Sequence, residues 1–122
     1  MKRHTLLVPL SQDHHHSLAL CVRILRDPAA DHRADILAHQ ADLLAHFAAE
    51  EALLAPWWAK LDAAAMQQRF QQDHATLRAL LADPAFGNED WQRRFAETLR
   101  EHARFEEREL FPALERLLPA AE

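Results

Sequence analysis

The apolar residues of this chain recur at the spacing of an α-helix in successive segments. The first segment has apolar side chains three, four and seven residues apart, at Leu18, Cys21, Val22 and Leu25. The second repeats the pattern over a longer stretch, at Ile36, Leu43, Phe47 and Leu54. Runs of Val, Ile and Thr, which strands prefer, are almost absent. The pattern therefore predicts an all-α protein.

Start and stop signals divide the chain into four helices. Ser11 and Asp62 are suitable N-caps for the first and third helices, and Pro56 should end or kink the second. The only glycine, Gly87, lies in a loop-like stretch just before Asn88, where the fourth helix is expected to begin. The expected helices run approximately over residues 11–27, 30–55, 62–82 and 88–118.

The short connections between these helices determine the expected architecture. Consecutive helices joined by short loops favour antiparallel neighbours, which predicts an up-down-up-down antiparallel four-helix bundle. A chain of 122 residues is long enough to bury one hydrophobic core. Residues 1–122 are accordingly expected to form a single domain.

Charge, hydropathy and cysteine content argue against several classes of partner and suggest a cellular compartment. The net charge is −5 and no cluster of Lys and Arg stands out, which argues against nucleic-acid binding. No segment approaches the roughly 20 apolar residues that cross a bilayer, so no membrane association is expected. The single cysteine, Cys21, forms no intrachain disulfide and suits a reducing cytosol. A cytoplasmic protein is expected, with the oligomeric state open between monomer and homodimer.

Histidine is unusually frequent, and part of the chain is repeated. Nine of the 122 residues are histidine. The sequence HFAAEEALLAP at 46–56 matches HARFEERELFP at 102–112. A weaker similarity relates QDHHHSL at 12–18 to QDHATL at 72–77. The second and fourth predicted helices therefore share one motif, and the first and third share another.

The stronger motif has the residue types and spacing of a metal site. Each copy has His and Glu four residues apart on one helix face, at His46/Glu50 and His102/Glu106. A carboxylate from each of two helices can bridge two cations, while each imidazole binds one cation as a terminal ligand. This mixture of nitrogen and oxygen donors suits iron or manganese. The adjacent Glu51 and Glu107 are rotated by about 100° around the helix and are expected behind the ligands or at the surface.

The first and third helices each offer a further histidine at a matching depth. With a rise of about 1.5 Å per residue, one candidate histidine on each helix falls within roughly 12 Å of a common level. In the third helix the candidate is His74, with leucines at the third and seventh following positions. The same offsets from His15 meet Leu18 and Val22, which favours His15 in the first helix. His14 remains the alternative, because it is the better match to the QDH motif.

At these residues the sequence resembles the haemerythrin-like, HHE cation-binding family over essentially its whole length. The resemblance rests on the twice-repeated HxxxEExxLxP pattern, together with Asp73–His74 in the third helix and a histidine in the first. It implies an oxo- or hydroxo-bridged centre of two non-haem iron ions inside a four-helix bundle. The implied ligands are the bridging Glu50 and Glu106 and the terminal His15, His46, His74 and His102.

Two positions depart from the pattern of the oxygen-carrying members of that family. Those members have a second histidine one turn after the third-helix ligand, where this chain has Arg78. They also use Asp five residues after the fourth-helix histidine, whereas this chain has Glu106 at four and Glu107 at five. The resemblance therefore implies the histidine-poorer branch, in which one iron is open to oxygen, peroxide or nitric oxide.

Three functions are compatible with this sequence. The leading hypothesis is a non-haem di-iron protein that senses, stores or reacts with a small diatomic or peroxide ligand, or handles iron. The second is a di-iron oxidase or peroxidase. Ferritin-like enzymes use Glu-x-x-His pairs, whereas here His precedes Glu and tyrosine is absent, so a dedicated enzyme is not expected. The third is a non-catalytic structural or interaction bundle. Zinc fits less well than iron, because six ligands are presented and zinc needs four or fewer.

Overall fold

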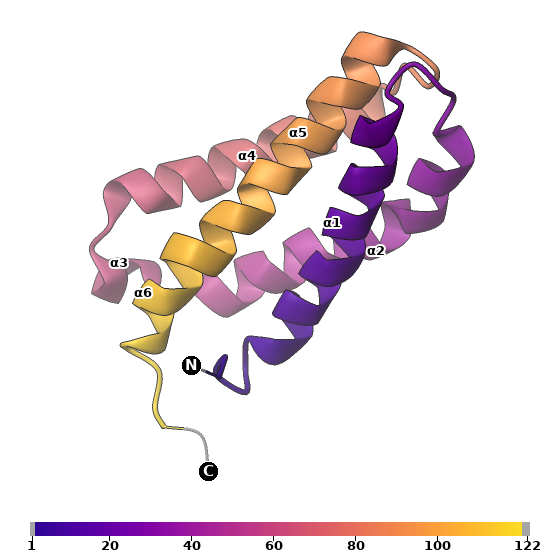
Figure 1. Ribbon diagram of the computed structural model, residues 1–122. Coiled ribbons are helices and arrows are strands. Elements are labelled where there is room, and N and C mark those ends of the chain that lie inside the picture. The colour runs from indigo at the N-terminus through magenta and orange to yellow at the C-terminus, as the bar shows by residue number, and fades with distance from the viewer. Residues whose placement is uncertain (1, 121–122) are drawn as a thin grey trace.

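The computed structural model describes residues 2–120, and its elements are all helical (Figure 1). The long helices are α1 (Val8–Arg26), α2 (Arg33–Leu54), α4 (Ala64–Ala82) and α5 (Glu89–Phe105). The short elements are α3 (Trp58–Leu61), the π-helix η1 (Glu106–Leu110) and α6 (Phe111–Glu115). No strand occurs within residues 2–120, which confirms the all-α prediction. Residues 1, 121 and 122 of the predicted domain lie outside the described residues.

Each long helix packs against two others. The most extensive contacts join α1 to α5, which run side by side in Figure 1, and α1 also packs against α2. On the other side, α4 contacts α5 and, more sparsely, α2. The four long helices therefore enclose a common interior, which is where the repeated histidines and glutamates lie.

Several helix boundaries differ from the sequence expectation. The first helix begins at Val8 rather than at 11, because Pro9 fits the first turn, where its missing N–H is not needed. The second begins at Arg33 rather than at 30. Asp62 does not cap the third long helix; it ends α3 in a left-handed conformation, with φ of +48°. Two expectations hold: α2 ends just before Pro56, and the Asn88 side chain accepts a hydrogen bond from Trp91 N.

The predicted fourth helix, residues 88–118, is not one continuous α-helix. After α5 the backbone passes through the π-helical turn η1 and then the short helix α6. In η1 the Phe111 amide donates to the carbonyl of Glu106, five residues back. Such turns are rare and occur often at functional sites. This one begins at Glu106 and contains Glu107, two acids that the site uses.

The buried face of α1 is also rotated relative to the prediction. Val22, expected to be buried, is 51% exposed, whereas Ser17, which was not expected there, is buried together with the expected Cys21. The side chains of Ser17 and Cys21 are small, and Cys21 shares a core cluster with Ala96 of α5. Small side chains at these positions are compatible with the extensive packing of α1 against α5.

The apolar core has two parts with a polar layer between them. One cluster includes Ile24, Phe47, Leu77 and Phe95, towards the end where the α1–α2 connection lies. The other includes Leu10, Leu54, Phe70, Phe105 and Phe111, towards the opposite end. On every long helix, the buried residues between these clusters include a candidate metal ligand.

The α1–α2 connection is attached to the start of α5 by one buried glutamine. The Nε2 group of Gln92 donates to the carbonyls of Pro28 and Ala30, and its Oε1 accepts from the backbone N–H of His32, 2.9 Å away. The Gln92 side chain is fully buried. It therefore satisfies loop backbone groups that water cannot reach.

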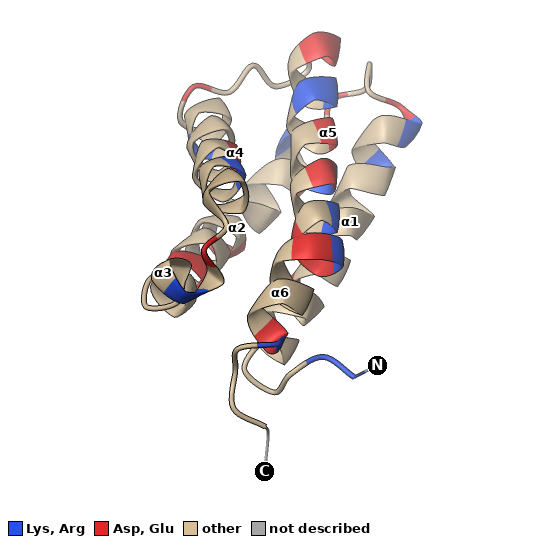
Figure 2. Cartoon of the chain, turned by 90° about the vertical axis from the view of Figure 1, so that its left-hand side faces the viewer, with Lys and Arg blue, Asp and Glu red and all other residues tan. Residues whose placement is uncertain are grey.

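The charged surface does not form a basic stripe. Figure 2 shows acidic and basic segments interspersed along α5. Many of these charges are paired within a helix, as Arg93 is with Glu89 at 2.8 Å. Within residues 2–120, no helix is both long enough and apolar enough to span a membrane.

Candidate metal centre

Six polar side chains lie buried between the two apolar clusters. They come from all four long helices and from η1, and they are His14, His46, Glu50, His74, His102 and Glu106. None is more than 5% exposed, and both carboxylates are 0% exposed. Two fully buried carboxylates side by side are costly unless cations or protons compensate them. Five of these six residues are the ones expected from the sequence. In α1 the buried histidine is the alternative rather than the preferred one.

The two glutamates occupy the middle of the cluster, and the ring nitrogens surround them. In each repeated motif the Nε2 atom faces its own glutamate four residues on, at 3.1 Å for His46 and Glu50 and 3.2 Å for His102 and Glu106. The other two histidines face the glutamate of another helix. The His14 Nε2 atom lies 2.9 Å from Glu106 Oε1, and the His74 Nε2 atom lies 3.1 Å from Glu50 Oε1.

These donors divide into two overlapping groups of four. One group combines His14 and His46 with both glutamates, and the other combines His74 and His102 with the same two glutamates. Within each group the donor atoms lie within 4.8 Å of one another. The His14 and His46 rings are 5.0 Å apart, and the His74 and His102 rings are 4.8 Å apart. The geometry therefore offers two equivalent positions, each with two imidazoles and a share in two carboxylates.

The α1 histidine in this cluster is His14, which corrects the preference for His15. His14 is 3% exposed and points inward, whereas His15 is exposed at the surface. The preference for His15 assumed that Leu18 and Val22 mark the buried face. The actual face contains Ser17 and Cys21, at the third and seventh positions after His14. The QDH motif shared with His74 was therefore the more reliable signal.

Several polar atoms in the cluster lack a hydrogen-bond partner among the described residues. They are Nε2 of His46 and one carboxylate oxygen, Oε2, of each of Glu50 and Glu106. The 3.1 Å approach of His46 Nε2 to Glu50 is too poorly angled for a hydrogen bond. Buried polar atoms of this kind are rare and call for an explanation. Nitrogen and carboxylate oxygen atoms that converge without bonding to each other fit a metal ion that would bind both.

The electrostatics of the cluster favour positive charge. Burial lowers the pKa of His14, but hydrogen bonds to Glu106 and Glu107 and the nearby Glu50 carboxylate outweigh burial and raise the pKa to about 11. Burial also opposes charging of His46 and His102, yet the glutamates beside them raise the pKa of both imidazoles. The surroundings of these imidazoles therefore favour a positive charge, which a bound cation would also supply.

The two glutamates respond differently to the same surroundings. Burial raises the pKa of Glu50, but its contacts with the four histidines outweigh burial and hold the pKa well below its usual value. Burial and the neighbouring charge of Glu50 raise the pKa of Glu106. Two adjacent carboxylates thus share a site in which only one ionises readily without a further cation.

Each of the four histidines in the buried cluster also contacts a carboxylate on its outer side, through its Nδ1 atom. The partners are Glu107 for His14, Asp13 for His46, Glu51 for His74 and Asp73 for His102, at 2.6–2.9 Å. Glu51 and Glu107 were expected behind the ligands or at the surface, and these contacts place them behind the ligands. The roles of Asp13 and Asp73 were missed. The available signal was that both aspartates directly precede an inward histidine in the QDH motif.

Arg78, which stands where oxygen carriers have another histidine, does not enter the cluster. Its guanidinium is bound to Glu51, with Nη2 3.0 Å from Oε1, and remains partly exposed. The Arg78 guanidinium holds the pKa of Glu51 below its usual range. This position therefore adds no nitrogen donor to the inner set and instead supports an outer carboxylate.

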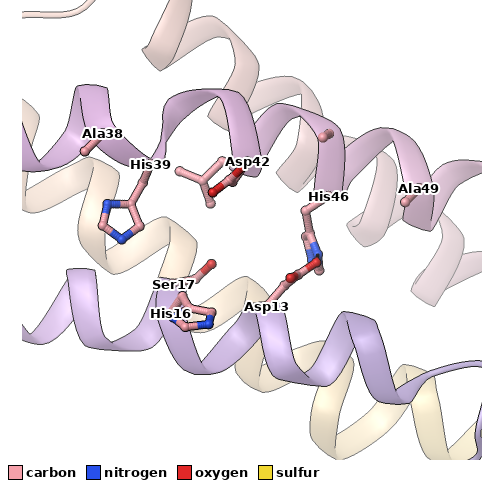
Figure 3. Close-up of a pocket in the computed structure, with 10 residues that line it drawn as sticks. Asp13, His16, Ser17, Ala38, His39, Asp42, His46 and Ala49 are labelled. Carbon is pink, nitrogen blue, oxygen red and sulfur yellow. Dashed lines mark hydrogen bonds and ion pairs between the residues drawn. The ribbon is translucent and has the colours of Figure 1, made fainter.

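Two surface pockets lead to the cluster from different sides. A pocket of about 440 Å³ between α1 and α2 is lined by Asp13, His16, His39, Asp42 and His46, among others (Figure 3). A second, of about 530 Å³, is lined by residues of α2, α3 and α4 that include Trp58, His74 and Arg78. Each pocket thus reaches one histidine of one half of the site.

Comparison with known families agrees with this geometry. A family model described as the hemerythrin HHE cation binding domain matches residues 6–115. No curated protein and no solved structure gave a significant match. The matched span contains every side chain of the buried cluster and its outer carboxylates.

Proposed function

Because the chain belongs to the hemerythrin HHE cation-binding domain family, we propose that its buried cluster binds two non-haem iron ions. Glu50 and Glu106 would be shared between them. His14 and His46 would complete one position, and His74 and His102 the other. The iron pair would supply redox and ligand-binding chemistry, while the protein binds, orients and encloses it.

The observation that carries the proposal is the burial of two carboxylates with unpartnered oxygens among four imidazoles. Both side chains are 0% exposed, and one oxygen of each bonds to no described residue. An uncompensated pair of this kind would destabilise the fold. Two divalent cations would neutralise the carboxylates and occupy the unpartnered oxygen and nitrogen atoms together.

The donor set supports iron or manganese above zinc. Imidazole nitrogen with carboxylate oxygen suits iron and manganese. Zinc sites that serve structure alone are closed by four ligands. Here each position shares two carboxylates with its neighbour and has only two imidazoles of its own, which leaves room for an added ligand.

We further propose that the added ligand is a small diatomic molecule or peroxide, and that the protein senses, stores or reacts with it or handles iron. The pockets that reach His46 and His74 support access from outside for small molecules. Arg78 stands in place of a further histidine and binds Glu51 outside the cluster. This favours a site with fewer nitrogen ligands than that of an oxygen carrier. A dedicated oxidase or peroxidase is the alternative.

The proposal includes an up-down-up-down order of the four long helices. It is supported by the neighbours of each helix, since α1 packs against α2 and α5, and α4 packs against the same two. In this arrangement helices that follow one another along the chain are adjacent, and α5 closes the bundle beside α1.

Anaerobic reconstitution tests the proposed function. The metal-free chain is titrated with Fe²⁺ under argon, and the bound iron is counted per chain. The expected result is about two iron ions per chain, followed by a change in visible absorption when oxygen or nitric oxide is admitted. Steady consumption of peroxide with a reductant would instead support the enzymatic alternative.

Matched variants make this test specific. Glu106→Gln removes one shared carboxylate and should reduce the iron count below two. Glu109→Gln changes an exposed acid in the same π-helical turn and should leave the count unchanged. Iron uptake that is absent in the natural sequence, or equal in both variants, would contradict the proposal.

A further inference from the structure

We propose that Asp13, Glu51, Asp73 and Glu107 form a closed ring of positioning residues that orients all four inner histidines. The inference rests on the proposed metal function and extends it from the ligands to the residues behind them. Each carboxylate binds the Nδ1 atom of a histidine on a neighbouring helix, so that the Nε2 atom faces the centre.

The two aspartates orient the histidines of the repeated HxxxE motif. Asp13 on α1 lies 2.9 Å from His46 Nδ1 on α2, and the two side chains point toward one another in Figure 3. Asp73 on α4 lies 2.9 Å from His102 Nδ1 on α5. In both cases the aspartate directly precedes an inward histidine of its own helix but binds the histidine of the next helix.

The two glutamates orient the other pair of histidines. Glu51 on α2 lies 2.7 Å from His74 Nδ1 on α4, and Glu107 in η1 lies 2.6 Å from His14 Nδ1 on α1. Each glutamate directly follows an inward glutamate of its own motif. The π-helical turn contributes here, since η1 contains both Glu106, which faces the centre, and Glu107, which faces α1.

An arginine holds each of these outer glutamates. Arg78 binds Glu51 through both terminal nitrogens, and Arg3 binds Glu107, with Nη2 3.2 Å from Oε1. Ser11 donates a further hydrogen bond to Glu107 at 2.8 Å. Arg3 lies before α1 in the chain, so the N-terminal segment takes part in the ring through Glu107.

The four contacts follow one another around the bundle without a gap. They connect α1 to α2, α2 to α4, α4 to α5, and η1 back to α1. The two halves of the chain are equivalent, because each supplies one aspartate and one glutamate. Each proposed metal position therefore has one histidine backed by an aspartate and one backed by a glutamate.

The chemistry of imidazole explains what such a ring does. An ionised carboxylate only accepts hydrogen bonds, so the histidine nitrogen that binds it must carry a proton. A proton held at Nδ1 leaves Nε2 as the nitrogen that ligates a cation, and it also restricts rotation of the ring. The ring therefore selects the tautomer of all four histidines and makes each depend on a neighbouring helix.

A diamagnetic metal allows this to be tested one histidine at a time. The chain is loaded with Zn²⁺, and the imidazole N–H groups are observed by ¹H–¹⁵N correlation spectroscopy. The natural sequence should give four imidazole Nδ1–H signals protected from exchange with water. Asp13→Asn should weaken or shift the signal of His46, because an amide can donate as well as accept and no longer fixes the proton at Nδ1. The signal of the adjacent His14 should stay unchanged. Glu51→Gln, Asp73→Asn and Glu107→Gln should act correspondingly on His74, His102 and His14.

Affinity for Fe²⁺ under argon provides the second measurement. Each ring variant should bind iron about 10–100-fold more weakly than the natural sequence. Asp42→Asn is the matched control, because Asp42 lines the same pocket as Asp13 and is likewise exposed, but lies outside the ring. If one variant fails to fold, the remaining three carry the test, since each assigns a different histidine.

The outcomes separate this inference from the proposed function. A natural sequence that binds metal, together with variants that change neither the N–H signals nor the affinity, would overturn the ring alone. An effect of Asp13→Asn on His14 rather than His46 would do the same. A natural sequence that takes up neither Zn²⁺ nor Fe²⁺ would overturn the ring and the proposed function together.

Discussion

At the residue scale, the three consecutive histidines of α1 have three different surroundings. His14 is buried against both inner glutamates, whereas His15 and His16 are exposed. Adjacent residues on a helix are rotated by about 100°, so only one of the three can face the centre. The proposed ligand set therefore depends on His14.

Substitution of His14 and of His15 should have opposite outcomes. His14→Ala removes one of two imidazoles from a proposed position and should lower the bound iron to about one ion per chain. His15→Ala removes an exposed side chain and should leave the iron count and the thermal midpoint unchanged. Iron counting on both variants checks this, and a loss confined to His15→Ala would contradict the assignment.

The raised pKa of His14 predicts how the metal-free protein responds to pH. The pKa is about 11 in the fold and ordinarily 6.5, so folding favours the protonated imidazole. Its contribution to stability is complete below pH 6.5 and is lost as the pH rises towards 11. The free energy of unfolding, measured by urea denaturation, should therefore fall across this window. In His14→Ala the free energy of unfolding should fall less steeply with pH. An equal slope in both proteins would contradict the account.

Much of the site could be predicted from residue spacing alone. His46, Glu50, His102 and Glu106 follow from a repeat with a clear helical period, and the structure brings them together. The choice between His14 and His15 failed because two faces of α1 carry apolar residues of similar extent. The contacts of Asp13 and Asp73 cross between helices, so they depend on packing that residue spacing does not specify.

At the element scale, Gln92 shows how a connection and a helix are held together. It bonds three backbone groups of the α1–α2 connection from a fully buried position on α5. The helix boundaries at Pro56 and Asn88 could be predicted from local signals. This long-range link could not, because nothing near Gln92 in the sequence identifies its partners.

Loss of the Gln92 side-chain amide should destabilise the fold. Gln92→Met keeps the length of the side chain but leaves buried loop groups without partners, at a cost of about 1–3 kcal/mol in the free energy of unfolding. Gln72→Met, an exposed position on α4, is the control and should change little. Equal urea midpoints for both variants would show that the buried link contributes nothing.

At the scale of the whole molecule, the candidate metal centre lies between two apolar clusters and joins all four long helices. The proposed inner ligands come from α1, α2, α4, α5 and η1, and the outer carboxylates connect the same helices in sequence. Because no helix supplies a complete position, cation binding and closure of the bundle should be energetically linked.

Removal of metal should therefore lower the stability of the whole bundle. A ligand present at a hundred times its dissociation constant adds about 2.7 kcal/mol per site to the folded state. Dialysis against a chelator should lower the thermal midpoint, and restored Fe²⁺ should recover it. The Glu106→Gln variant should show a smaller difference between the loaded and metal-free forms. A midpoint independent of metal in the natural sequence would contradict the link.

The most direct test of the two-metal centre is the elemental composition of the protein itself. The chain is purified from cells supplied with iron, without chelators, and its metals are counted against its molar concentration. The account predicts about two iron ions per chain in the natural sequence. Fewer than one metal ion of any kind per chain would contradict it.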